Sequence, residues 1–144
     1  MYEFQREPEE WSVLWSGNGC KTQRPHRDYF CDDITDSVQA ESEHSYAAII
    51  SLTDSSYVPI WRDSDISQLF SFQVVTLNAG DILVFRDDTI HAGGPYPSGH
   101  FGRLHCYLQS SKVRHRFGQN DWIKSITASQ LRELDVEVTR QIYG

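Results

Sequence analysis

Short apolar segments separated by turn-forming residues dominate this sequence and limit the folds that it can adopt. About seven segments have the length and composition of β-strands, and Gly, Asn, Asp or Pro lies at nearly every junction between them. The predicted strands or extended segments are residues 11–16, 21–30, 45–53, 57–61, 70–77, 82–86 and 103–109. Many short strands with frequent turns favour a sandwich, a jelly roll or a small barrel.

The periodicity changes near residue 127, where the pattern becomes helical. An apolar residue recurs there at steps of three or four, which places one apolar stripe on a helix over about residues 128–142. The stripe consists of Leu131, Leu134, Val138 and Ile142. Thr127 or Ser129 can cap this helix, which we expect to cover one side of a sheet. With 144 residues and no linker, the sequence predicts one domain over residues 1–144, with its core at about 20–110.

Charge and cysteine content restrict the partners and the compartment. The formal net charge is −7, which disfavours nucleic acid and anionic membranes as partners. No apolar run is long enough to span a membrane, and the charged first ten residues do not resemble a signal peptide. The three cysteines are scattered, as is typical of free thiols in a reducing compartment. These features predict an intracellular, cytoplasmic protein without a membrane partner.

Two histidines and one aspartate follow a pattern that suits a metal ion. His26 and Asp28 lie two residues apart in a predicted extended segment, and alternate residues of a strand point to the same face. His91 follows the predicted strand 82–86 after a short loop. Two histidines and one carboxylate on one side of an ion form the facial triad of non-haem Fe(II) oxygenases, which leaves the opposite positions open for cosubstrate and O₂. A His-x-Asp tripeptide alone is a common chance occurrence.

Three segments together resemble a known family. The sequences QRPHRDY, GDILVFRDDTIHAGGP and RLHCYLQ are similar, in this order, to the core of the 2-oxoglutarate/Fe(II)-dependent dioxygenases. The resemblance is to the phytanoyl-CoA-hydroxylase-like and prolyl-hydroxylase-like branches, and it covers about residues 20–110. It implies a mainly β fold, the double-stranded β-helix or jelly roll, here with a C-terminal helix.

The resemblance also implies a set of site residues. It makes His26, Asp28 and His91 the Fe(II) ligands, and Arg103 matches the arginine that binds the distal carboxylate of the cosubstrate 2-oxoglutarate. A planar guanidinium suits this role because it binds a carboxylate through two parallel hydrogen bonds and keeps its charge when buried. The implied cofactors are Fe(II), 2-oxoglutarate and O₂.

Two further residues are candidates for binding 2-oxoglutarate. His105 stands where family members often have Ser or Thr, so it either donates a hydrogen bond to the same carboxylate or is a core histidine. By strand alternation it shares the inward parity of Arg103. Tyr46 is a candidate second donor. It shares one face of its strand with Ala48 and Ile50, and the sequence leaves open which face of residues 45–53 lines the barrel.

The function that we expect is oxidative. The leading hypothesis is an Fe(II)- and 2-oxoglutarate-dependent oxygenase that hydroxylates a C–H bond of a small molecule or of a protein side chain. One alternative is a cupin-like metal enzyme that shares the triad but works without 2-oxoglutarate. The other is a non-catalytic jelly-roll domain with a binding or structural role, in which His26 and Asp28 are ordinary polar residues. Substrate identity and oligomeric state are not encoded in any pattern that we can interpret.

Overall fold

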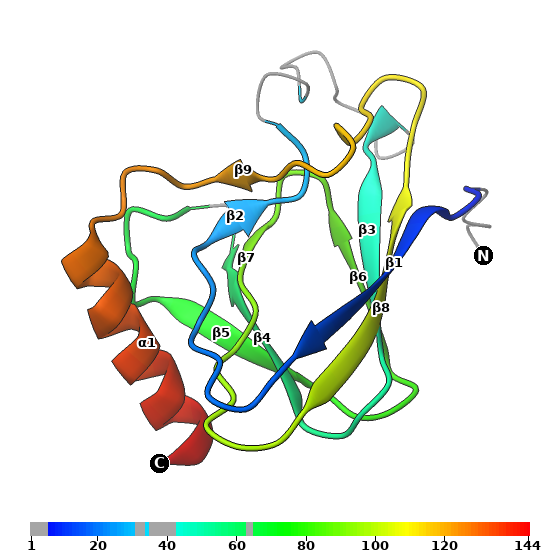
Figure 1. Cartoon of the computed structure of the whole chain (residues 1–144). Coiled ribbons are helices and arrows are strands. Elements are labelled where there is room, and N and C mark those ends of the chain that lie inside the picture. The colour runs from blue at the N-terminus through cyan, green and yellow to red at the C-terminus, as the bar shows by residue number, and fades with distance from the viewer. Residues whose placement is uncertain (1–5, 31–33, 35–42, 63–64) are drawn as a thin grey trace.

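The structure, a computed structural model, describes residues 6–30, 34, 43–62 and 65–144. Within these ranges it contains short strands followed by one helix (Figure 1). The elements are β1 (Glu9–Ser16), β2 (His26–Arg27), β3 (Tyr46–Ser51), β4 (Ser56–Trp61), β5 (Phe72–Leu77), β6 (Ile82–Arg86), β7 (Ile90–His91), β8 (Phe101–Leu108), β9 (Asp121–Trp122) and α1 (Ala128–Tyr143).

The strands form two antiparallel sheets that face each other. One sheet has four strands in the order β1-β8-β3-β6, and the other has five in the order β5-β4-β7-β2-β9. Consecutive strands along the chain therefore often lie in different sheets, as a jelly roll requires. The predicted fold class, a mainly β double-stranded β-helix with a C-terminal helix, is confirmed.

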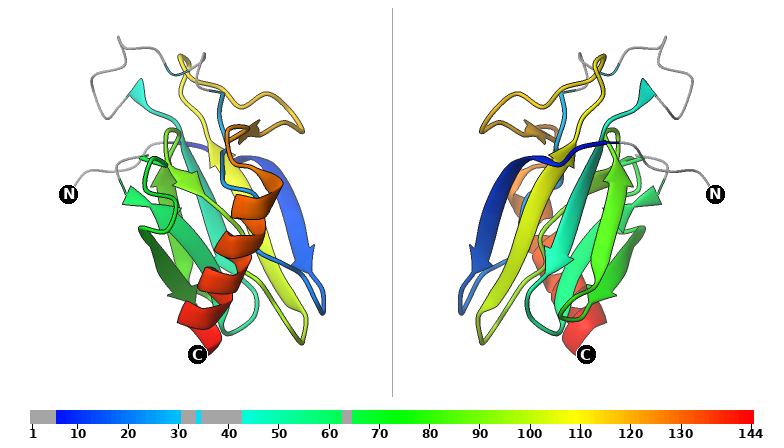
Figure 2. Two further views of the ribbon diagram at one scale, coloured as in Figure 1. Left: turned by 90° about the vertical axis from the view of Figure 1, so that its left-hand side faces the viewer. Right: turned by 90° about the vertical axis from the view of Figure 1, so that its right-hand side faces the viewer.

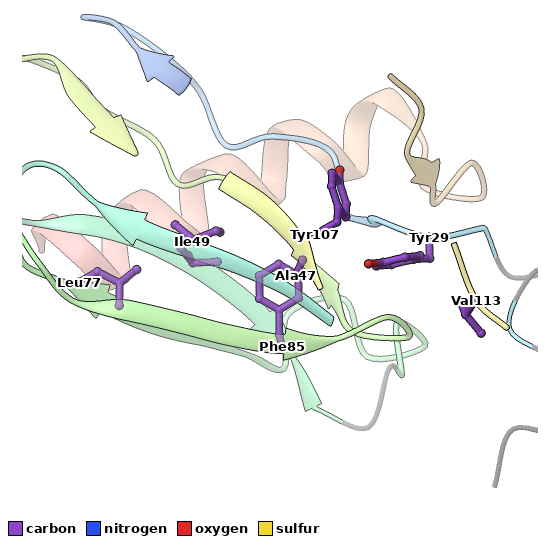
Figure 3. Packing of buried hydrophobic residues seen from close by; sticks show 8 residues of the cluster. Tyr29, Ala47, Ile49, Leu77, Phe85, Tyr107 and Val113 are labelled. Atoms are coloured by element: carbon purple, nitrogen blue, oxygen red, sulfur yellow. The ribbon is translucent and has the colours of Figure 1, made fainter. Parts of the chain in front are cut away.

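The core between the sheets is built from alternate residues of the strands. On β3, Ala47 and Ile49 are buried in the central cluster, where they meet Phe85 of β6 and Tyr107 of β8 (Figure 3). Tyr46 lies on the other face of the same strand, where it packs against a smaller cluster of buried residues. This alternation answers the question that the sequence left open: residues 47, 49 and 51 face inward.

The predicted strand at 21–30 is reduced to the two residues of β2. Pro25 has no N–H to donate to a strand ladder, which limits regular pairing on its side. The chain before it is held instead by single contacts, such as the Gln23 N–H that donates to the Gly93 carbonyl at 2.9 Å. The strands β7 and β9 were not predicted, because a two-residue strand has no detectable periodicity.

The helix α1 covers the outer side of the five-stranded sheet (Figures 1 and 2). Thr127 is its N-cap and forms a reciprocal capping box with Gln130. The predicted apolar stripe is confirmed, since Leu134 and Val138 are fully buried in a cluster that includes Trp61 and Ile90 of the sheet. Among the described residues, no helix is both long and apolar enough to cross a membrane.

Candidate metal centre

The strands β2 and β7 bring the three predicted metal ligands together. His26 and His91 are directly opposite each other in the antiparallel ladder, so their side chains project from the same face. Asp28 Oδ1 lies 3.5 Å from His26 Nε2 and 3.4 Å from His91 Nε2. Two ligands that bind one ion at right angles, each about 2.1 Å away, lie about 3 Å apart. The three buried side chains therefore match the spacing of ligands on one side of a metal ion.

The backbone fixes which imidazole nitrogen faces this point. Nδ1 of His26 lies 3.0 Å from the Arg24 carbonyl oxygen, and Nδ1 of His91 lies 3.2 Å from the Thr89 carbonyl oxygen. A carbonyl oxygen only accepts hydrogen bonds, so each Nδ1 carries the proton and donates it. In the neutral form of each ring the lone pair is then on Nε2, the atom that faces Asp28. Both histidines are thus held in the tautomer that binds a metal through Nε2.

The charge state of the cluster also suits a cation. Burial lowers the pKa of His91 from its ordinary value, although the Asp28 carboxylate opposes this shift. Burial on its own would raise the pKa of Asp28, but the neighbouring imidazoles, led by that of His91, hold it well below its ordinary value. At neutral pH the cluster therefore presents a neutral imidazole at His91 and an ionised carboxylate at Asp28.

The second carboxylate oxygen of Asp28 has its own partner, His105. Nε2 of His105 donates to Asp28 Oδ2 at 2.9 Å, and both side chains are buried. Of the two roles that the sequence left open for His105, neither describes this contact. The side chain lines the site, but here it orients a candidate ligand. The sequence indicated that His105 faces inward, because it lies two residues after Arg103 on the same strand. It could not indicate that Asp28 is the hydrogen-bond partner of His105, because this contact depends on how β8 pairs with distant strands.

A cavity of about 420 Å³ opens beside the cluster and is lined by its side chains together with Arg103 of β8. His105 and Tyr107 of the same strand also line it, which confirms the predicted inward parity. The Nε atom of Arg103 is buried, and among the described residues it has no hydrogen-bond partner. A buried N–H of a charged guanidinium that lacks a hydrogen-bond partner raises the free energy of the folded state. It therefore indicates that an anionic group binds beside Arg103.

Gln23 and Gly93 form the wall next to this arginine. The Gly93 N–H donates to Gln23 Oε1 at 3.0 Å. A Cβ atom added at Gly93 would lie 3.2 Å from Arg103 Nη2 and 3.3 Å from Gln23 Oε1. Glycine at this position therefore leaves room for the guanidinium. Sequence reasoning missed Gln23, because the alternation expected for residues 21–30 assumed a regular strand.

Tyr46 does not join this site. It lies on the outward face of β3 and packs against the cluster of Ala48, Cys106 and Leu108. It is not among the described residues that line the cavity. The prediction that Tyr46 donates to 2-oxoglutarate is therefore corrected: strand alternation points its side chain away from Ile49, which does line the cavity.

Two aromatic rings pack on the candidate ligands. The Trp122 ring lies 4.7 Å from the His26 ring, and the Phe85 ring lies 4.4 Å from the His91 ring, measured between centroids. They restrict ring rotation and keep water from the sides of the imidazoles. Trp122 belongs to the short strand β9, which pairs with β2, and no periodic signal in the sequence marks it.

No family model matches this sequence, and no curated protein matches it. Solved structures do resemble its fold. The non-heme alpha ketoglutarate dependent epimerase SnoN from nogalamycin biosynthesis is 16% identical, with a TM-score of 0.54 over 76% of this chain and 48% of that chain. The non-heme monooxygenase ThoJ, in its apo form, is 14% identical, with a TM-score of 0.56 over 75% of this chain and 48% of that chain.

A third similar structure is AviO1 from Streptomyces viridochromogenes. It is 14% identical, with a TM-score of 0.54 over 75% of this chain and 52% of that chain. The chain thus spans about half the length of these three structures. At such identities the likeness establishes a shared fold, and function must be argued from the site.

Proposed function

We propose that this chain is an Fe(II)- and 2-oxoglutarate-dependent oxygenase that hydroxylates a C–H bond of its substrate. One observation carries the proposal: the buried triad of His26, Asp28 and His91 lines the same cavity as Arg103, whose buried Nε atom has no hydrogen-bond partner among the described residues. The first group suits a divalent metal, and the second suits an anion beside it. Two of the structures with a similar fold, SnoN and ThoJ, are described as non-heme enzymes, which supports this proposal.

The donor set fits iron. Two neutral imidazoles and one carboxylate are ligands that Fe(II) accepts, and their placement on one side leaves further positions facing the cavity. When bound, the metal and its cosubstrate supply the oxidative chemistry, and the protein supplies binding, orientation and exclusion of water.

The chain's own residues have separate roles in this proposal. His26, Asp28 and His91 hold the metal, and His105 keeps the second Asp28 oxygen occupied. Arg103 binds the far carboxylate of 2-oxoglutarate through its guanidinium. The distribution of charge supports this assignment, because the cavity lining contains one carboxylate, that of Asp28, among the described residues. An anion that enters would therefore meet the arginine without a competing acid from this lining.

A second candidate is a cupin-like metal enzyme that does not use 2-oxoglutarate. The His105–Asp28 contact favours considering it, because the residue two positions after Arg103 is engaged by a metal ligand. Where family members often have Ser or Thr beside the arginine, this chain has His105, so Arg103 has no neighbouring hydroxyl group at that position. In that case Arg103 would bind an anionic substrate directly.

Anaerobic titration separates these functions. Fe(II) and then 2-oxoglutarate are added to metal-free protein, and the weak visible charge-transfer band of the complex is recorded. The variants are His26→Ala and Arg103→Ala, with Arg132→Ala on the exposed side of α1 as the matched arginine control. We expect no band in His26→Ala and an unchanged band in the control. Arg103→Ala should bind metal normally but bind 2-oxoglutarate roughly 10–100-fold more weakly, as loss of a charged hydrogen bond predicts.

Each other outcome selects a different function. Metal binding without the band, together with turnover that needs no 2-oxoglutarate, would establish the cupin-like enzyme. If the wild-type protein binds neither Fe(II) nor Mn(II), the result would favour the third hypothesis, a non-catalytic jelly-roll domain. Loss of metal in Arg103→Ala, with no change in cosubstrate affinity, would show that the role assigned to Arg103 is wrong.

A further inference from the structure

A second cation, Lys21, lines the cavity together with Arg103. Lys21 belongs to the segment that follows the turn after β1 and runs back toward β2 (Figure 1). Backbone hydrogen bonds at Cys20 and Gln23 hold this segment along the chain that follows β7. Alternate residues of an extended chain point to the same side, and both Lys21 and Gln23 line the cavity. The backbone therefore places these two side chains on the cavity side of the segment.

Neither Lys21 nor Arg103 forms an ion pair with a carboxylate among the described residues. Other basic side chains of this acidic chain do so, namely Arg27, Arg86, Lys112, Arg114 and Arg140. Asp28 is the one carboxylate in the described lining, and its Oδ2 atom already accepts a hydrogen bond from His105. An anion that enters the cavity therefore meets two cations that are not neutralised by this lining.

Gln23 adds uncharged donors beside Arg103. The Gly93 N–H can only donate, so the Gln23 atom that it contacts is the carbonyl oxygen, and the amide NH₂ group remains. Among the described residues this NH₂ group has no hydrogen-bond acceptor. A Cβ atom added at Gly93 would lie within 3.3 Å of both Gln23 Oε1 and Arg103 Nη2, so these two side chains are neighbours. Lys21, Gln23 and Arg103 thus supply N–H donors to the cavity, which suits anionic ligands.

The charges of the loaded site leave one positive charge without a partner. With the histidines neutral, Lys21 and Arg103 exceed Asp28 by one positive charge in the described lining. A divalent metal ion and 2-oxoglutarate, which has two carboxylates, cancel each other. One positive charge therefore remains in the cavity when both are bound, although the whole chain has a net charge of −7. A cleft with an excess of one sign concentrates ligands of the opposite sign.

We propose that the substrate is a small molecule with a single carboxylate, which Lys21 binds. This inference rests on the proposed function, because the charge count assigns Arg103 to 2-oxoglutarate. A phosphate monoester carries about −1.5 to −2 charges at pH 7, which exceeds the charge that remains. The cavity of about 420 Å³ is near the lower end for small-molecule sites, roughly 300–1,000 Å³. Leu14, Ile49 and Val58 also line it, so we expect the part of the substrate beside them to be apolar.

Proton relaxation of a matched series of probes tests this proposal. The probes are hexanoate, hexan-1-ol, hexylammonium and hexyl phosphate, and each is titrated into protein loaded with Mn(II) and saturating 2-oxoglutarate. Mn(II) speeds the relaxation of a probe that binds beside it, and the Zn(II)-loaded protein supplies the diamagnetic baseline. We expect hexanoate to bind more tightly than each of the others. Its advantage over hexan-1-ol should be about 5-fold, the upper end for a solvent-accessible ion pair.

Three lysine variants assign the preference to one side chain. Lys21→Gln removes the charge with little change in volume, so hexanoate should lose its advantage over hexan-1-ol. Lys21→Arg keeps the charge and should keep the advantage. Lys124→Gln is the matched control, because Lys124 is exposed and is not among the described residues that line the cavity. An unchanged Mn(II) affinity in each variant establishes that the fold and the metal centre are intact.

The outcomes separate this inference from the proposed function. Equal binding of hexanoate and hexan-1-ol by the wild-type protein overturns the inference, as does an advantage that persists in Lys21→Gln. Tighter binding of hexyl phosphate than of hexanoate overturns the choice of a carboxylate. In these cases 2-oxoglutarate still binds, so the proposed function stands. If the Mn(II)-loaded wild-type protein does not bind 2-oxoglutarate, the proposed function fails, and the charge count fails with it.

Discussion

Nε2 of His105 donates a hydrogen bond to Oδ2 of Asp28 at 2.9 Å, while Oδ1 of the same carboxylate faces His26 and His91. The two oxygens of one side chain are thus divided between two tasks. One is available to a metal, and the other is anchored to β8. This division keeps the carboxylate from turning both oxygens toward an ion.

Replacing His105 should weaken metal binding although it is not one of the three candidate ligands. His105→Leu removes the donor and leaves Asp28 free to rotate, so we expect Mn(II) affinity to fall about 10–100-fold, the usual effect of losing a partner of a metal ligand. His105→Gln keeps an N–H donor and should recover most of the affinity. Calorimetric titration of metal-free protein measures both. Equal affinities in the two variants would contradict a positioning role for His105.

Gly93→Ala should disturb 2-oxoglutarate binding more than metal binding. The added Cβ would lie 3.2 Å from Arg103 Nη2, so the guanidinium must move by a few tenths of an ångström. The three atoms nearest to it belong to Arg103 and Gln23 and not to the candidate metal ligands. We expect a severalfold weaker 2-oxoglutarate titration with unchanged Mn(II) affinity.

The matched control is Gly17→Ala, where the added Cβ meets only the His100 ring at an ordinary contact distance of 3.8 Å. This variant should behave like the wild-type protein in both titrations. A similar loss in both glycine variants would point to a general loss of stability, not to the Arg103 wall.

The metal-free protein should lose stability as the pH falls below about 6.5, the ordinary pKa of histidine. The pKa of His91 is lowered in the folded state, so the unfolded chain binds protons first, and stability that is present above about 6.5 is lost as the pH falls toward the folded pKa. The lowered pKa of Asp28 acts in the same direction at still lower pH. Thermal unfolding midpoints from pH 8 to pH 5.5 measure the effect. In His91→Gln the unfolding midpoint should depend less steeply on pH between pH 6.5 and pH 5.5. An unchanged dependence would show that other titrating groups cause the loss of stability.

Leu134→Ala should destabilise the fold by about 2–5 kcal/mol, because it leaves a cavity in a buried cluster. Leu134 is fully buried where α1 packs on the five-stranded sheet. Denaturant unfolding measures the loss. Val136→Ala on the exposed side of the same helix is the control and should change stability by less than about 0.5 kcal/mol. A loss in Val136→Ala as large as that in Leu134→Ala would contradict burial as the cause, because alanine has the higher helix propensity at both positions.

Much of the fold could be predicted because it depends on local patterns. The strand at 82–86 has the predicted bounds, and Thr127 caps the helix as the sequence indicates. The spacing of His26 and Asp28 and the parity of Arg103 with His105 were also visible, since alternation along a strand is a local property.

What could not be predicted depends on pairing between distant segments. The partner of His105 and the outward direction of Tyr46 follow from the register of β8 and β3, which no local pattern contains. Trp122 reaches His26 only because two-residue strands pair. That the buried Nε of Arg103 has no hydrogen-bond partner among the described residues could be seen only in the structure, because it depends on which side chains surround that atom.

The direct pairing of His26 with His91 has a mechanical consequence. These residues are 91 − 26 = 65 positions apart, and the strands that carry them have only two residues each. An ion held by both would close a long loop and tie together the β2–β7 ladder, which has the shortest register in the five-stranded sheet. Metal content would then set how readily this sheet opens to proteases and to hydrogen exchange, so a shortage of metal would shorten the lifetime of the folded protein.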